Sequence, residues 1–534
     1  MNVPGGYMGK IAVVDLENKR IENIFPSDRI LRDYIGGANI AAKYLYDMTD
    51  EHTNPLGPEN VIIFMTGPLT GTRAFASSRH AIVSKSPLTG IWGESDVGGS
   101  WGLKLKSCGY DGLIVKGRSS VPVTINVRED EIEISPAQDI WGLDTIETHK
   151  RVREMLNDEH TSISCIGPAG ERQVPMACIM IDGEDARAAG RCGLGAVMGS
   201  KLLKAIAVVP GSKTPSVYDE EKLNESVKHV APDVVKKTGL LKEFGTARGV
   251  VTNAEIGDMP VKNWQIGEWI DVCQNLSGQA LKETYLVKRY HCPGCVIGCG
   301  RVVRIPRGKF KDTVAAGPEY ESMAGMGSMC MIDDLAVVVE ATDLCNRFGI
   351  DTMSAGTAVA YGMEAYEKGL ITSKDTGGVP LNWGDGDALI WLIERMAYGE
   401  GIGQLLGQGV KKAAAILGGN AEEFAVHIKG LEMAFHDPRA LSSLALSYAT
   451  YHRGACHRGC THNIERGSYP ELGFAQPIDR FGVDRKAEAV VLMQNYAETY
   501  EALKLCKLIM PAIKIADVID WLNCVTGQDY SFDE

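Results

Sequence analysis

The sequence predicts an α+β protein with a β-rich N-terminal domain followed by two mainly α-helical domains. Short β-type runs broken by Gly and Pro turns fill the chain up to about residue 210, and long amphipathic segments follow. A chain of 534 residues is also too long for one hydrophobic core. We expect domains at residues 1–212, 213–420 and 421–534. The glycine-rich stretch 417–420 marks the second boundary, although a helical hairpin turn has the same pattern.

Alternation and apolar runs locate the strands, and the 3.6-residue period locates the helices. Predicted strands are Lys10–Asp15, Val61–Thr66, Gly112–Lys116, Val121–Val127 and Ala205–Pro210. Predicted helices are Leu335–Phe348, Ser354–Lys368, Ala388–Tyr398 and Ala487–Ile509.

Composition excludes several classes of partner. A net charge of −13 argues against binding to nucleic acid or to an anionic membrane. No apolar run approaches the roughly 18 residues of a membrane span, and the first residues show no basic or signal-type segment. We therefore expect a cytoplasmic protein. Its 14 cysteines then indicate metal binding or ordinary burial rather than disulfides.

The sharpest local motif is HCPGCVIGCG at residues 291–300, which spaces Cys292, Cys295 and Cys299 as Cys-x2-Cys-x3-Cys. These spacings place three thiolates on one face of a helical turn, with Pro293 at its first position. Thiolate-rich sites select zinc or an iron-sulfur cluster, and both need a fourth ligand.

Two sources of the fourth ligand stay open from the residues alone. The segment 456–462 holds two cysteines and two histidines, which keeps zinc in contention. Cys506, on the predicted C-terminal helix, completes a cluster equally well. Seven cysteines outside these motifs are expected to be small buried hydrophobes: Cys108, Cys165, Cys178, Cys192, Cys273, Cys345 and Cys524.

A second motif, ARAAGRCGLGAVMGSK at residues 186–201, places two arginines among four glycines. Small residues let backbone donors approach an anion, and arginine adds bidentate donors. The spacing fits neither a P-loop nor the Gly-x-Gly-x-x-Gly fingerprint. The motif therefore predicts anion binding of another type, or a plain tight turn.

Taken together, these segments resemble the aldehyde:ferredoxin oxidoreductase family over nearly the whole chain. The matching segments stand in the family's order: GPLTGT at 67–72, KSPLTG at 85–90, IGPAGE at 166–171, RAAGR at 187–191, GAVMGSK at 195–201 and GPEYES at 317–322. The resemblance implies a tungsten or molybdenum bis-pterin, a Mg²⁺ ion bridging the pterin phosphates, and a 4Fe-4S cluster.

Site residues follow from the resemblance by position. It implies that Cys292, Cys295, Cys299 and Cys506 are the cluster ligands, which favours iron-sulfur over zinc. It places Arg79 between pterin and cluster. It also implies pterin contacts at Asp96, Val97, Gly98, Arg187, Ala188, Ala189, Gly190, Asn346, Gly349, Ile350, Asp351, Glu501, Lys504 and Leu505.

The chain departs from the family pattern at several of these positions. Asp96 replaces an amide residue, and a carboxylate facing magnesium would be an equally good oxygen ligand. Asn346 replaces an aspartate, and Lys504 stands where the pattern has glycine. We hypothesise that the Lys504 cation raises the cluster potential. Ile390 replaces the histidine that would pair with Glu340, so we predict no metal bridging two subunits.

For the chemistry, the resemblance implies a substrate-side pair, Glu321 and His457. Glu321 would manage the proton of water or substrate, and His457 would donate a hydrogen bond to the developing oxyanion. The predicted reaction oxidises an aldehyde to a carboxylic acid, or runs in reverse, and passes electrons through the cluster to ferredoxin.

Two alternatives are kept. One is a relative that reduces an activated acyl or aromatic compound, of the benzoyl-CoA reductase type, with Cys330, Cys456 or Cys460 as an extra metal ligand. The other is a non-catalytic iron-sulfur electron-transfer subunit, which would not need the phosphate-binding segments. Expected partners are a small aldehyde or acid, ferredoxin or a dedicated iron-sulfur subunit, and a second copy of the chain. Characterised relatives continue beyond the position of Glu534, so a partner subunit is a candidate to close the substrate channel.

Overall fold

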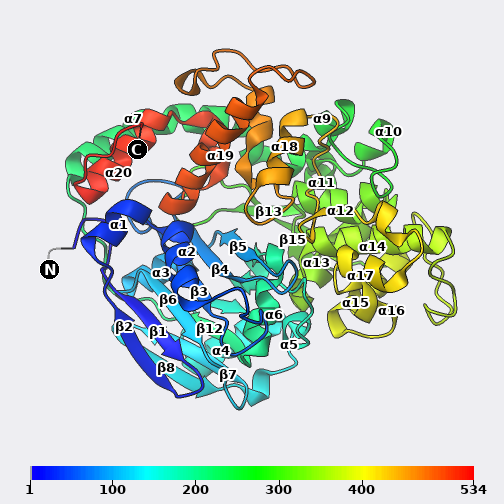
Figure 1. Cartoon of the computed structure of the whole chain (residues 1–534), viewed down its shortest axis with the longest axis horizontal. Coiled ribbons are helices and arrows are strands. Elements are labelled where there is room, and N and C mark those ends of the chain that lie inside the picture. Colours follow the sequence, from blue (N-terminus) through cyan, green and yellow to red (C-terminus); the bar gives the residue numbers. More distant parts are fainter. Residues whose placement is uncertain (1–2, 534) are drawn as a thin grey trace.

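The computed structural model describes residues 3–533, and its N-terminal part is built on two six-stranded sheets (Figure 1). The first sheet has the order β2 (Arg20–Ile24), β1 (Ile11–Asp15), β6 (Gly112–Lys116), β3 (Ile62–Met65), β4 (His80–Lys85), β5 (Trp92–Val97). The second has the order β11 (Arg187–Ala189), β10 (Ile179–Ile181), β9 (Ser162–Cys165), β12 (Leu203–Val208), β7 (Val123–Arg128), β8 (Glu131–Pro136).

The strand predicted at Val61–Thr66 is β3, and all four of its residues are buried. It lies between β6 and β4 and pairs antiparallel with both. Apolar side chains of the two sheets share one core. The helices of this part are α1 (Asp28–Tyr34), α2 (Gly37–Met48), α3 (Trp101–Ser107), α4 (Thr145–Leu156), α5 (Pro168–Glu171) and α6 (Leu194–Ser200).

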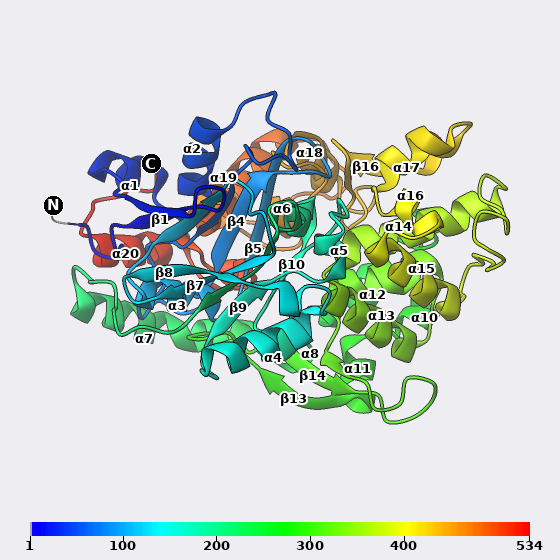
Figure 2. The same cartoon turned by 90° about the horizontal axis from the view of Figure 1, so that it is seen from below.

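Helices dominate the rest of the chain, as predicted (Figure 2). They are α7 (Glu220–Lys237), α8 (Gly239–Phe244), α9 (Val250–Glu255), α10 (Ile270–Cys273), α11 (Gly278–Thr284), α12 (Tyr320–Met326), α13 (Leu335–Phe348), α14 (Thr352–Glu367), α15 (Gly386–Tyr398), α16 (Ile402–Leu406), α17 (Val410–Leu417), α18 (Ser442–Thr450), α19 (Lys486–Leu503) and α20 (Ile515–Thr526). Small sheets join β13 (Leu286–Tyr290), β14 (Gly300–Arg304) and β15 (Val314–Ala316), and β16 (His427–Ile428) with β17 (Leu431–Glu432).

The predicted fold class is confirmed, and the amphipathic pattern placed α13 at its observed bounds. The predicted helix over 487–509 is wrong at its C-terminal end. Lys504 has a φ of 60°, a left-handed conformation that ends α19 at Leu503. Cys506 therefore lies in the turn after the helix. The glycines at 418 and 419 form a turn after α17, and a domain boundary there stays a prediction.

Among residues 3–533, no single helix is long and apolar enough to cross a membrane. One bent pair, Tyr320–Cys330 with Leu335–Phe348, meets the length and composition criteria together. Most residues of this pair are buried in the core of the helical part.

Candidate active site

The four cysteines predicted as cluster ligands converge from two distant parts of the chain. Cys292, Cys295 and Cys299 lie in the loop between β13 and β14, and the backbone of one residue joins this loop to Cys506. Ala76 donates its N–H to Gly294 O at 3.2 Å and accepts from Cys506 N at 2.9 Å. The loop is not the predicted helical turn. Glycines at 294 and 298 adopt left-handed φ angles of 66° and 67°, which no helix accommodates.

Exposure separates these four cysteines from the rest. They are half-buried, whereas the other ten cysteines are buried, and those include the seven predicted as hydrophobes. Burial raises the pKa of the Cys299 thiol to about 12, so a bound metal would have to displace its proton. In the described part of the chain, no three of the sulfurs lie within 4.8 Å of one another. One tetrahedral zinc would hold thiolates about 3.8 Å apart, so the wider spread fits a cluster better.

Arg79 links the cysteines to the predicted pterin segment on β5. Its Nη1 lies 3.8 Å from Cys506 Sγ, its Nη2 donates to Asp96 O at 2.9 Å, and its Nε contacts the Asp96 carboxylate. Gly98 is close enough to the loop that a Cβ on it would lie 2.9 Å from Cys292 Sγ. The two predicted cofactor sites are therefore in contact through this strand end.

Asp96 and Glu501 are buried carboxylates surrounded by cations. Lys504 Nζ lies 3.0 Å from an oxygen of each, and Arg458 contacts both. Burial by itself would raise the pKa of Asp96, but Arg79 and Lys504 hold it well below its ordinary value. The further contacts are Arg79 with Asp96 and Lys507 with Glu501 at 2.7 Å.

Four cations thus contact two carboxylates, an excess of two positive charges among these ion pairs (4 − 2). Uncompensated buried charge is unfavourable, so this network fits an anionic cofactor at its edge. Two departures from the family pattern, Asp96 and Lys504, neutralise each other here. The hypothesis that Lys504 raises the cluster potential stays a prediction, and its ammonium group donates to the carboxylates of Asp96 and Glu501.

The remaining predicted pterin segments also meet. A Cβ on Gly190 would lie 2.8 Å from Asp351 Oδ1, and Ala177 pairs with Ile350 in an isolated β-bridge. Gly349 ends α13 with a φ of 69°, and Asp351 caps α14. Ala188 and Ala189 lie on β11, while Val97, Asn346 and Leu505 are buried.

The two arginines of the predicted anion-binding motif differ in how much donor capacity they use, although Arg191 Nε is unpartnered as well. Arg187 stacks over the Tyr290 ring at 4.8 Å, and its buried Nη2 has no hydrogen-bond partner. Arg191 instead donates to the carbonyls of Ala455 at 3.0 Å and Glu432 at 2.5 Å. The sequence could not distinguish these two roles.

The side chains of the predicted catalytic pair, Glu321 and His457, face each other, and their nearest atoms are buried. Glu321 stands in the first turn of α12, and its Oε2 accepts from Phe435 N at 3.0 Å. Its Oε1 lies 3.2 Å from His457 Nδ1, yet the two are not aligned for a hydrogen bond, and both are buried without another partner. Burial lowers the pKa of His457 to about 3, so its imidazole is neutral.

The sequence did not identify the groups behind this pair. His436 Nδ1 lies 2.7 Å from Asp258 Oδ2, and its Nε2 lies 3.7 Å from Glu321 Oε1. The His436 ring stacks on Tyr320 at 4.7 Å and on His462 at 5.2 Å. Burial by itself would lower the pKa of His436, but Asp258 raises it above its ordinary value. No motif marks His436 or Asp258, which lie in loops far apart in the sequence.

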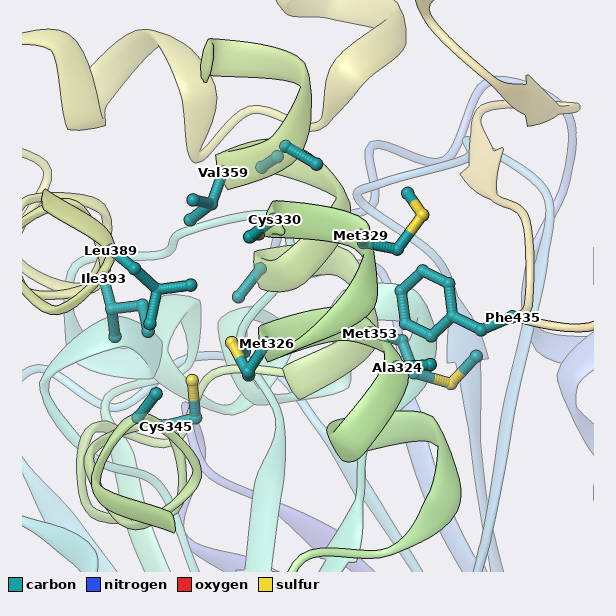
Figure 3. Close-up of a cluster of buried hydrophobic side chains, with 14 of the residues drawn as sticks. Ala324, Met326, Met329, Cys330, Cys345, Met353, Val359, Leu389, Ile393 and Phe435 are labelled. Carbon is teal, nitrogen blue, oxygen red and sulfur yellow. The ribbon is translucent and has the colours of Figure 1, made fainter. Parts of the chain in front are cut away.

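Cys330, kept as an extra metal ligand, is a core residue instead (Figure 3). It lies among apolar side chains that include Met326, Met329 and Val359, and it is fully buried. Cys456 is also buried, and Arg453 Nη2 donates to its sulfur at 2.7 Å.

The model of the aldehyde ferredoxin oxidoreductase N-terminal domain matches residues 11–210, and that of domains 2 and 3 matches residues 222–534. The chain belongs to the aldehyde ferredoxin oxidoreductase family. It is 37% identical over 536 aligned positions to the tungsten-containing aldehyde ferredoxin oxidoreductase of Thermococcus kodakarensis, covering 99% of this chain and 86% of that protein.

The chain is also similar to a further relative and to a solved structure. It is 31% identical to an aliphatic sulfonate oxidoreductase, WOR-like subunit, of Pyrococcus furiosus, covering 87% of this chain and 77% of the relative. A solved structure of the active site complex BamBC of benzoyl coenzyme A reductase with 1,5-dienoyl-CoA superposes with a TM-score of 0.87. It is 23% identical and covers 99% of this chain and 87% of that chain, so it shows the shared fold alone.

We predict that Asp258→Asn destabilises the protein by about 1.5–3 kcal/mol at pH 6, and by less at pH 9. Asp258 raises the pKa of His436 in the folded protein. Their contact therefore contributes its full stabilisation below the pKa of a histidine in the unfolded chain, about 6.5. That contribution is lost as the pH rises through the folded pKa. The destabilisation is measured as the difference in apparent melting temperature between wild type and variant across this pH range.

Asp437→Asn is the matched control. This buried carboxylate contacts Arg439 at 2.6 Å, and arginine stays charged from pH 6 to 9. The difference in apparent melting temperature between this variant and the wild type should stay constant from pH 6 to 9. A pH-independent gap for Asp258→Asn would contradict a charged His436.

Proposed function

We propose that this protein oxidises aldehydes to carboxylic acids, or catalyses the reverse reaction, and exchanges electrons with ferredoxin through a 4Fe-4S cluster. The observation that carries the proposal is the facing pair of unsatisfied buried atoms, Glu321 Oε1 and His457 Nδ1. Buried polar atoms are nearly always satisfied, so a pair without partners marks a site that a substrate or water completes.

The cofactor would be a bis-pterin holding tungsten, the metal of the named relatives, or molybdenum. When bound, it would accept two electrons from the substrate carbon. We assign its binding to Arg79, the segments 96–98 and 187–190, Asn346, the segment 349–351, Glu501, Lys504 and Leu505. The excess positive charge around Asp96 and Glu501, and the unpaired Nη2 of Arg187, support an anionic group with phosphates. Those phosphates would also bind a Mg²⁺ ion.

Residues of the chain would handle the protons. The overall reaction, RCHO + H₂O → RCOOH + 2e⁻ + 2H⁺, requires a base near the water and a donor near the carbonyl oxygen. Glu321 is anchored through Oε2, which leaves Oε1 to accept a proton from water. The neutral His457 imidazole would donate a hydrogen bond to the developing oxyanion.

Cys292, Cys295, Cys299 and Cys506 would hold the 4Fe-4S cluster, which when bound would supply one-electron transfer, and Arg79 lies beside Cys506. Ferredoxin is the acceptor implied by the relatives' name, and a dedicated iron-sulfur subunit is the alternative. We place the protein in the cytoplasm, where its 14 free cysteines stay reduced, and include a homodimer among its assemblies.

Glu321→Gln should lower kcat/KM for aldehyde oxidation by about 10²–10⁴-fold, because a positioned proton acceptor contributes about that factor. Tungsten and iron content should stay at wild-type levels. The assay is aldehyde-dependent reduction of a viologen dye under anaerobic conditions. Glu283→Gln, the same change on an exposed residue of α11, is the control and should keep full activity. Loss of tungsten from Glu321→Gln would show a structural role instead.

Cys506→Ala should abolish the cluster, because it removes one of four ligands. Iron and acid-labile sulfide per chain, measured after anaerobic purification, should fall to less than about half. Cys345→Ala also removes a thiol, but one buried in the apolar core, and should retain both. Full iron in Cys506→Ala would exclude this residue as a ligand.

A further inference from the structure

A second group of potential metal ligands lies outside the predicted cofactor residues. Glu94 on β5, His452 after α18 and Glu498 on α19 place one ligand atom each within 4.8 Å of the others. His452 Nε2 lies 3.2 Å from Glu94 Oε2. Among residues 3–533, this is the one group of three such side chains with that spacing. Three separate elements thus direct donor atoms to one point.

The two carboxylates of this group form no direct ion pair with Lys or Arg, although Lys504 and Lys507 act on them at longer range. Glu94 is 2% exposed, and its Oε1 has no hydrogen-bond partner. In the described part of the chain, no Lys or Arg nitrogen lies within 4 Å of the carboxylate of either Glu94 or Glu498. Two carboxylates held this close without a cation repel each other, and partial burial strengthens the repulsion. A divalent cation would turn it into attraction.

Neighbouring aromatic residues hold the donors in place. Tyr451 donates its hydroxyl to Glu498 Oε1 at 2.8 Å, which leaves the second oxygen available. The imidazole of His452 packs against the Tyr451 ring at 4.1 Å and the Trp92 ring at 6.2 Å. Oriented ligands of this kind are typical of metal sites. The side chain of His452 is 36% exposed, so solvent can reach the site and supply water ligands.

We propose that Glu94, His452 and Glu498 bind one divalent first-row transition metal ion, separate from the metals of the cofactor and cluster. Two carboxylate oxygens and one imidazole nitrogen suit Mn²⁺, Fe²⁺ or Zn²⁺, whereas Mg²⁺ and Ca²⁺ prefer oxygen alone. The ion joins β5 to α19, the two elements that carry Asp96 and Glu501. It therefore fixes the N-terminal sheet against the C-terminal helices beside the cofactor site.

The test is equilibrium dialysis of anaerobic holoenzyme against Mn²⁺, with free and bound ion measured by electron paramagnetic resonance. Mn²⁺ is the probe because thiolates bind this hard ion weakly. Wild type should bind one Mn²⁺ per chain more than the double variant His452→Gln/Glu498→Gln does. Mn²⁺ should also raise the apparent melting temperature of the wild type and not that of the variant.

The control is Glu51→Gln/His52→Gln, which removes an exposed Glu–His pair 3.6 Å apart that has no third ligand. It should bind Mn²⁺ as the wild type does. The single variant Glu498→Gln should weaken binding by more than about tenfold. Equal Mn²⁺ binding by wild type and the double variant, or no saturable binding by the wild type, would overturn the proposal. Because the readout is ion binding, its outcome is independent of aldehyde turnover.

Discussion

Two buried carboxylates, Asp96 and Glu501, impose the constraint on which the site depends. An ionised carboxylate stays inside a protein only if cations and hydrogen bonds replace its water. Arg79, Lys504, Arg458 and Lys507 supply those cations from the N-terminal and C-terminal parts of the chain. The same contacts fix β5 against the end of α19, and so bring Cys506 to the cysteine loop. The ion pairs that stabilise Asp96 and Glu501 therefore also set the position of Cys506 beside the cysteine loop.

Two departures from the family pattern are explained by this arrangement. Read along the sequence, Asp96 and Lys504 are an added negative and an added positive charge 408 positions apart. In space they form an ion pair at 3.0 Å. Each substitution alone would leave a buried charge poorly matched, since removing one partner of a buried pair costs about 3–5 kcal/mol. The sequence could not show this, because contact between distant residues depends on the tertiary fold.

The sequence predicted what depends on local pattern and missed what depends on backbone exceptions or long-range contacts. Amphipathic periodicity correctly predicted the bounds of α13, and the apolar run at 61–66 correctly predicted β3. Residues with left-handed φ angles explain the two errors in the predicted helices. Gly294 and Gly298 prevent a helix in the cysteine loop, and Lys504 ends α19 earlier than predicted. His436 and Asp258 carried no motif at all, although they stand directly behind Glu321. The resemblance named the cysteines, Glu321 and His457, and their roles stay predictions.

Elemental analysis of protein purified without oxygen tests the central claim most directly. Each chain should contain about four irons, as one 4Fe-4S cluster requires. It should also contain one tungsten or molybdenum, with pterin recovered from the same sample. Iron without tungsten or molybdenum, in protein purified from cells supplied with both metals, would contradict the account and indicate an electron-transfer subunit. Zinc in place of iron would overturn the cluster assignment itself.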